Sequence, residues 1–374
     1  MTGERHRWTL AEFNGALGDT GTLLPLLIGA ITVGGMSPIP VLLGFALAYL
    51  VTGLVYRLPV PVQPMKAIAA LVMVTEVTPE AVAMAGLMIG AVLVLLGATG
   101  AIDRLARLVP RSIIAGLRLG LGLSLAWIAL GLMMGDLAMA AAAVALLAVA
   151  RCMGAPSAFI LITAGAIIAA VSDAPVNNIQ GAWQPDWVIA PNLSVASDAL
   201  TDIVLPQLAL TLTNAVIVTA LVAGELFGTK AAQVTPRRLC LSSGLLNCAL
   251  APFGALPMCH GAGGLAAHNA FGARSGAAVL MMGGLLAIAT LSADTSTTLL
   301  VSFPESVLGV LLLVAAIELA KDRRLTDSRP SCYPVIGITA VICVVLDPFS
   351  GLVAGTVAEF LRKWVLHHMR LREQ

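Results

Sequence analysis

Apolar runs follow one another from residue 11 to residue 366 and are separated only by short polar joints. A helix needs about 20 apolar residues to cross the hydrocarbon core of a bilayer, so the pattern predicts an all-α polytopic membrane protein. We expect fourteen spans, at residues 11–33, 38–56, 64–75, 80–99, 112–133, 137–152, 156–172, 203–223, 237–251, 258–271, 275–292, 298–319, 332–346 and 350–366. The mean hydropathy of +0.95 and a charged fraction of 11% agree with this interpretation and exclude an ordinary soluble domain.

The third and tenth predicted spans are too short to cross a bilayer, and each follows a proline. Pro59, Pro61 and Pro64 in "LPVPVQP" favour an extended stretch that leads into a helix starting at Pro64. Pro257 stands in the same position before the tenth span. Non-helical backbone at membrane depth is tolerated only where it is buried in protein or lines a cavity. These two half-helices are therefore predicted to border a site.

Seven spans precede the long polar loop and seven follow it, which predicts two inverted repeats. The first repeat covers residues 1–172, an extracytoplasmic loop covers 173–202, the second repeat covers 203–366, and a short tail covers 367–374. In both halves a polar-interrupted span precedes the half-helix. These interruptions read "NGALGDTGT" in the first span and "QLALTLTNA" in the eighth.

The charges support this topology, because basic residues in cytoplasmic joints orient membrane proteins. The opposite joints hold acidic residues and no lysine or arginine. Both termini are therefore predicted to be cytoplasmic, with no cleaved signal peptide, in the plasma or inner membrane. The basic joint residues are Arg5, Arg7, Arg57, Arg104, Arg107, Arg111, Arg151, Lys230, Arg237, Arg238, Arg274, Lys321, Arg323, Arg324 and Arg329, followed by the tail from Arg362.

Recognisable enzyme motifs are missing from the sequence, which contains neither Gly-x-Ser-x-Gly nor His-Glu-x-x-His. The six cysteines are scattered without a Cys-x-x-Cys pair, so we expect no metal and no disulfide framework. The protein is predicted not to be an enzyme, to use no cofactor, and to have membrane lipid rather than nucleic acid as its surroundings.

The starts of the two half-helices are the predicted binding site, because helix N-termini attract anions. Lys66 adds a full positive charge, although a lysine can also reach the membrane interface. A tetrahedral oxyanion suits such donors. The substrate-binding candidates are Gln63, Pro64, Met65 and Lys66 at the third span, Met258, Cys259, His260 and Gly261 at the tenth, and the neutral donors Thr22, Thr213 and Asn214.

Each of these candidates also has a structural interpretation. His260 can be a satisfied core histidine, Gly261 can serve close helix packing, and the threonines and Asn214 can bond between helices.

Two acidic residues are candidates for coupling transport to protons or ions. Asp19 lies in the middle of the first span, where an ionisable group is a functional candidate. It can alternatively cap a broken helix or pair with Lys66. Glu225 lies near the cytoplasmic end of the eighth span, where a polar partner or interface role is an equal alternative.

Four segments resemble the motifs of the molybdate transporter family, a branch of the sulfate permease (SulP) superfamily. They are "GALGDTGTLLP", "PVQPMKAIAA", "LTLTNAVI" and "LPMCHGAGGLAAHNAFGARSG". The resemblance implies a nucleobase-permease type of fold, with fourteen spans as a seven-plus-seven inverted repeat divided into core and gate domains. It also implies a homodimer. Sulfate permeases continue into a cytoplasmic STAS domain, and the short tail here is what the molybdate branch leads us to expect.

The resulting expectation is a secondary active transporter that imports molybdate, with sulfate as a competitor, by movement of the core against the gate. The choice of molybdate rests on the resemblance. A transporter of sulfate or another oxyanion and a proton-coupled nucleobase permease of the same fold are the alternatives. A nucleobase site calls for carboxylates in the eighth and tenth spans, and the tenth has Cys259 and His260 instead. A passive channel is a third possibility.

Overall fold

The computed structural model describes residues 8–74, 77–171, 199–291, 302–321, 325 and 328–372. The first half contains α1 (Leu10–Gly18), α2 (Thr20–Thr32), α3 (Pro38–Tyr56), β1 (Gln63–Pro64), α4 (Lys66–Val74), α5 (Pro79–Thr99), α6 (Ala101–Leu108), α7 (Arg111–Met134), α8 (Leu137–Cys152) and α9 (Ser157–Val171). Most of the outer loop, at 173–198, lies outside the described residues, as do Arg5 and Arg7, the start of the twelfth predicted span and the end of the tail.

The second half begins with η2 (Ala199–Val204), α11 (Leu205–Leu210), η3 (Thr211–Val218), α12 (Thr219–Phe227), η4 (Gly228–Gln233), α13 (Pro236–Leu250) and η5 (Ala251–Phe253). It continues with β2 (Met258–Cys259), α14 (Ala262–Ala270), α15 (Ala277–Leu291), α17 (Glu305–Ala320), η6 (Pro330–Cys332), α19 (Tyr333–Val345) and α20 (Pro348–Arg372). The predicted all-α architecture is confirmed.

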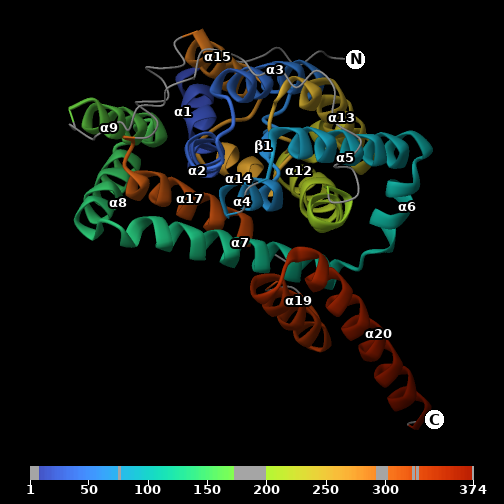
Figure 1. Ribbon diagram of the computed structural model, residues 1–374. Coiled ribbons are helices and arrows are strands. Elements are labelled where there is room, and N and C mark those ends of the chain that lie inside the picture. Colours follow the sequence, from blue (N-terminus) through green and yellow to red (C-terminus); the bar gives the residue numbers. More distant parts are fainter. Residues whose placement is uncertain are drawn as a thin grey trace.

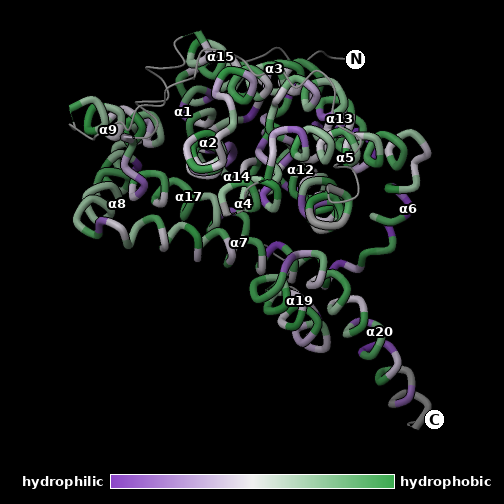
Figure 2. Tube along the Cα trace, viewed as in Figure 1, coloured by the Kyte–Doolittle hydropathy of each residue, from purple (hydrophilic) through white to green (hydrophobic). Residues whose placement is uncertain are grey.

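Within the residues that the structure describes, four helices are long and apolar enough to cross a membrane, or five if the bent α1–α2 pair is one span. They are Pro38–Tyr56, Pro79–Thr99, Arg111–Met134 and the continuous run Gln207–Gln233. Figure 2 shows hydrophobic positions along most of the outer helices, with hydrophilic ones gathered on α6 and towards the end of α20. The number fourteen stays a prediction, because several other apolar helices are shorter than a full span.

The centre of the molecule holds the two strands and the short helices that follow them (Figure 1). The α3 helix packs on α15 and α5 packs on α13. On the other side α7 packs against α17 and α19, while α17 also contacts α2 and α14. Helices α19 and α20 extend away from the rest in Figure 1.

The first predicted span, which the sequence shows as interrupted by polar residues, consists of two helices in the structure. Helices α1 and α2 meet at Asp19 with a bend of 47°. The Thr20 hydroxyl donates to the Leu17 carbonyl at 2.6 Å, and the Thr22 hydroxyl donates to the Asp19 carbonyl at 3.0 Å. Such side-chain bonds compete with the helical ladder. The bend therefore falls at the polar "GDTGT" segment.

Candidate functional site

The two strands join the starts of the half-helices. β1 and β2 pair antiparallel, with Gln63 opposite Cys259 and Pro64 opposite Met258. The Met65 N–H donates to the Pro257 carbonyl at 2.9 Å. Because α4 and α14 begin within three residues of these strands, the pairing brings both helix starts together at the centre of the fold.

The α13 helix holds β2 through Asn247. Its side-chain oxygen accepts from the Met258 N–H at 2.9 Å, and its amide donates to the Met258 carbonyl at 2.6 Å. The side chains of Met65 and Met258 are buried in the hydrophobic core. Their backbone N–H groups are both bonded within the protein, so these two residues shape the site rather than supply donors to it.

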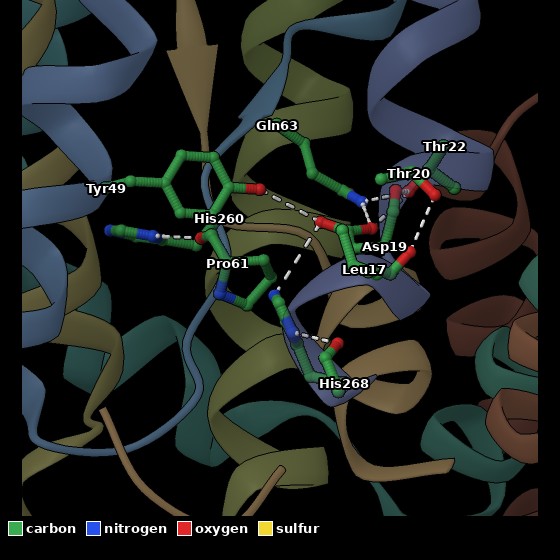
Figure 3. A network of polar contacts seen from close by, with 10 residues as sticks. Leu17, Asp19, Thr20, Thr22, Tyr49, Pro61, Gln63, His260 and His268 are labelled. Atoms are coloured by element: carbon green, nitrogen blue, oxygen red, sulfur yellow. Dashed lines mark hydrogen bonds and ion pairs between the residues drawn. The ribbon is translucent and has the colours of Figure 1, made fainter. Parts of the chain in front are cut away.

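Asp19 is the centre of a buried polar network at the α1–α2 bend (Figure 3). Gln63 donates from Nε2 to Asp19 Oδ1 at 2.6 Å, and the Thr22 hydroxyl donates to the same oxygen. Tyr49 from α3 donates to Asp19 Oδ2 at 3.1 Å. Of the sequence-predicted residues, the structure therefore brings together Asp19, Thr22 and Gln63.

Two glycines let α14 approach this network closely. A Cβ atom on Gly264 would lie 2.5 Å from Gln63 Nε2 and 2.7 Å from each Asp19 carboxylate oxygen. A Cβ atom on Gly261 would overlap Gln63 Oε1. The Gly-rich start of α14 is thus required by its contact with Gln63 and Asp19.

His260 is bonded on both ring nitrogens. Nδ1 lies 2.9 Å from the Pro61 carbonyl, and Nε2 lies 2.7 Å from the Ser242 hydroxyl, which in turn contacts the Tyr56 hydroxyl at 2.7 Å. Because a carbonyl only accepts, Nδ1 carries the proton in a neutral ring. His260 therefore ties the extended stretch before β1 to α13.

The two helix starts differ in how their first N–H groups are satisfied. At α4, Gln207 Oε1 accepts from the N–H groups of Ala67 at 2.8 Å and Ile68 at 3.3 Å. The same side chain donates from Nε2 to Thr211 at 2.8 Å. At α14 the N-cap residue is Gly261, which has no side chain, and no side-chain cap hydrogen bond forms within the described residues. We expected first-turn N–H groups without a protein acceptor at both helices. Among the described residues they are found at α14, whereas those of α4 are bonded to Gln207.

Lys66 begins α4 and is half-buried. Within the described part of the chain its ammonium forms no hydrogen bond or ion pair, and the Asp19 carboxylate takes other partners. The alternative in which Lys66 pairs directly with Asp19 is therefore not realised in this structure.

Thr213 and Asn214 lie in η3, a π-helical segment, and are both buried. Thr213 donates to the Ala209 carbonyl at 2.9 Å. Asn214 Oδ1 has no hydrogen-bond partner among the described residues. Single π-helical turns inside α-helices are frequent at functional sites.

Glu225 belongs to a different place. It accepts from Arg118 of α7, whose guanidinium also donates to the carbonyls of Leu319 at 3.3 Å and Lys321 at 2.7 Å. These carbonyls lie at the C-terminal end of α17. Asp19 lies near the middle of α17 instead, because Gly21, two residues after it, packs against Leu312. Seven residues of helix separate the two places by about 10 Å.

Sequence reasoning missed three residues of the site, namely Tyr49, Gln207 as a cap, and His268. His268 of α14 is buried, with Nδ1 2.8 Å from the Gly15 carbonyl and Nε2 3.9 Å from Asp19 Oδ2. A histidine in an otherwise apolar half-helix is the signal that points to it.

Comparison with known proteins places the chain in a family. The sequence model described as "Molybdate transporter of MFS superfamily" matches residues 11–125 and 199–319. Molybdate transporter 2 of Arabidopsis thaliana is 29% identical, over 94% of this chain and 87% of its own length. Molybdate transporter 1 of Chlamydomonas reinhardtii is 30% identical, over 94% of this chain and 92% of its own length. These relatives are transporters, which confirms the expectation that the protein is not an enzyme.

Solved structures match over most of the chain. The transmembrane domain of a cyanobacterium bicarbonate transporter, BicA, aligns with a TM-score of 0.58 at 16% identity, covering 92% of this chain and 97% of that one. SLC26A9 aligns with a TM-score of 0.63 at 16% identity, covering 94% of this chain and 64% of that one. At this identity the likeness establishes the fold, which this chain shares with BicA and SLC26A9. The chain therefore belongs to the molybdate transporter family.

Proposed function

We propose that the protein is a secondary active transporter that imports molybdate, and that the anion binds between the start of α14 and Lys66. The observation that carries the proposal is the β1–β2 pair, which joins the start of α4, with its Lys66, to a start of α14 that no side chain of the described residues caps. The names of the curated relatives favour molybdate over other anions.

The first turn of α14 supplies the backbone donors in this proposal. Its first intrahelical bond runs from the Leu265 N–H to the Gly261 carbonyl at 3.0 Å. The N–H groups of Ala262, Gly263 and Gly264 therefore have no acceptor within the helix. Such amides sit at the positive end of the helix dipole and favour an anion.

Lys66 supplies the charge, because the neighbouring amides of α4 are already bonded to Gln207. Together with the positive end of α14, its ammonium offsets part of the charge of a dianion at low dielectric. Gln63, Thr22, Cys259 and the π-helical residues Thr213 and Asn214 are proposed to complete the surroundings. Gln207 and His260 are proposed to hold the two helix starts in position.

Alternating access is proposed to occur by movement between two groups of helices. One contains the half-helices with α1, α2, α3, α13 and α15, and the other contains α7, α17, α19 and α20. The Arg118–Glu225 pair crosses from α7 to α12 and is proposed to break during the cycle. We further propose cytoplasmic termini, a plasma-membrane location and a homodimer. The positive-inside pattern and the family fold support these assignments.

The test is uptake of radiolabelled molybdate into proteoliposomes containing the purified protein. Saturable uptake that excess sulfate inhibits only weakly supports a molybdate transporter. Equal or better transport of sulfate makes it a general oxyanion transporter, and nucleobase uptake without molybdate uptake contradicts the proposal. Non-saturable flux at increasing molybdate concentration indicates a channel instead.

A further inference from the structure

His268 has one ring nitrogen whose state is fixed by the fold. Nδ1 lies 2.8 Å from the Gly15 carbonyl, and a carbonyl oxygen can only accept. Nδ1 therefore carries a hydrogen whether the ring is neutral or charged. In a neutral ring the other nitrogen, Nε2, then presents a bare lone pair.

That lone pair faces a carboxylate. Nε2 lies 3.9 Å from Asp19 Oδ2, both side chains are fully buried, and Nε2 has no hydrogen-bond partner within the described residues. A neutral imidazole beside an ionised carboxylate would leave the Nε2 lone pair without a donor among the described residues, facing a carboxylate oxygen that already accepts from the Tyr49 hydroxyl. Buried polar groups are rarely left in that state, because the free energy of desolvation is then not offset by a hydrogen bond.

We infer that Asp19 and His268 hold one shared proton, and that this proton accompanies the anion through the transport cycle. The inference rests on the proposed function. The proton comes from water on the side to which the site is open, binds to the pair, and returns to water on the opposite side. Only one N–H or O–H bond forms and breaks, and no other reactant is needed.

Gln63 connects this pair to the proposed anion site. Its Nε2 donates to Asp19 Oδ1, and its side chain fills the space beside Gly261 and Gly264 at the start of α14. Neutralising the carboxylate weakens the charge-assisted bond from Gln63. The position of Gln63 beside the first turn of α14 therefore depends on whether the pair holds its proton.

Other ionisable groups reach the pair from the surrounding helices. Tyr49 of α3 donates to Asp19, Lys66 of α4 interacts with Asp19 electrostatically, and Glu12 of α1 interacts with His268. Glu12 is itself engaged by the N–H groups of Arg274 and Ser275. A dianion bound nearby favours the protonated pair, so anion binding takes up a proton and affinity falls as pH rises.

The test is calorimetric titration of the purified full chain with molybdate, in buffers of different ionisation enthalpy, from neutral to alkaline pH. The difference between buffers gives the number of protons taken up on binding. Asp19→Asn mimics the protonated carboxyl group and can donate to Nε2. His268→Asn keeps a donor for the Gly15 carbonyl but lacks Nε2. His368→Asn, at an exposed position of α20, is the matched control.

In the wild type and in His368→Asn we expect proton uptake to rise from near zero at neutral pH, where the empty pair already holds its proton, towards about one per anion at alkaline pH, where affinity falls by up to tenfold per pH unit. Both pair variants should still bind molybdate, with no proton uptake and a flat pH profile. Binding without proton uptake in the wild type at every pH up to the alkaline end of the range, or proton uptake that survives Asp19→Asn, overturns the inference and leaves the proposed function standing. No binding by the wild type overturns both. If His268→Asn does not fold, the isosteric Asp19→Asn decides alone.

Discussion

The starts of α4 and α14 share one backbone plan but differ in what they leave open. Each is a nine-residue helix that follows a two-residue strand. At α4 the protein's own Gln207 bonds the first amides, and Lys66 has no hydrogen-bond or ion-pair partner among the described residues. At α14 the amides are uncapped, and His260 is bonded on both nitrogens. The difference indicates that α4 provides charge and α14 provides directed donors.

Removing the charge from α4 is expected to have the largest effect. Lys66→Ala should weaken molybdate binding roughly 10- to 100-fold, because a hydrogen bond to a charged group contributes about 1.5–3 kcal/mol. Lys66→Arg should retain most of the affinity. Lys363→Ala, at an exposed position of α20, is the matched control for loss of a lysine. Titration of the purified variants measures the effect, and unchanged affinity in Lys66→Ala would remove α4 from the site.

Adding one carbon to α14 is expected to disturb the donors. Gly264→Ala would press a methyl group against Gln63 and both Asp19 oxygens. Overpacking of this kind costs about 1–3 kcal/mol, so we expect a lower melting temperature together with loss of uptake. Gly337→Ala in α19 has open space around it and should change neither. A Gly264→Ala protein with normal uptake would show that this close approach is dispensable.

Changing the cap of α4 separates its structural part from its effect on charge. Gln207→Glu keeps an acceptor for Ala67 and Ile68 but adds a negative charge, so it should bind molybdate less tightly than wild type. Gln207→Ala loses a cap contributing about 1 kcal/mol of stability, with a smaller effect on affinity. Thermal melts measure the stability of both variants, and titrations measure their affinity for molybdate. Tighter binding by Gln207→Glu than by the wild type would contradict the prediction.

The smallest effect is expected at His260. Ser242→Ala removes its Nε2 partner and the contact with Tyr56. A neutral hydrogen bond contributes about 0.5–1.5 kcal/mol, so stability should fall slightly while molybdate affinity stays the same. A marked loss of affinity would show instead that His260 takes part in recognition.

Local sequence signals were enough to predict the two half-helices. The partners of Asp19 and the cap of α4 depend on the packing of distant helices and could not be predicted. Prolines constrain their own neighbourhood, so "LPVPVQP" was enough to predict an extended stretch before a short helix. The predicted start at Pro64 was wrong, because Pro64 pairs with Met258 in the strands and the helix begins at Lys66. Asp19 attracted attention because a carboxylate is costly inside a membrane. Its actual partners Tyr49 and His268 come from other helices, and one sequence does not reveal which helices meet. The same limit hid Gln207 as the cap of α4.

Glu225 illustrates a second limit. Its position near the end of a span made it a candidate for ion coupling, with a polar partner as the alternative, and the structure shows Arg118 as such a partner. Arg118 lies inside an apolar span and so did not enter the comparison of charged joints. Only the packing of α7 against the end of α17 brings these side chains together.

The central claim is that the anion lies between the first turn of α14 and Lys66. The most direct measurement is a crystal structure of the protein with molybdate, with anomalous scattering recorded at the molybdenum absorption edge. The account predicts one peak within hydrogen-bonding distance of the amides of Ala262, Gly263 or Gly264 and of the Lys66 ammonium. A peak elsewhere in the fold, such as beside Arg118, would contradict it.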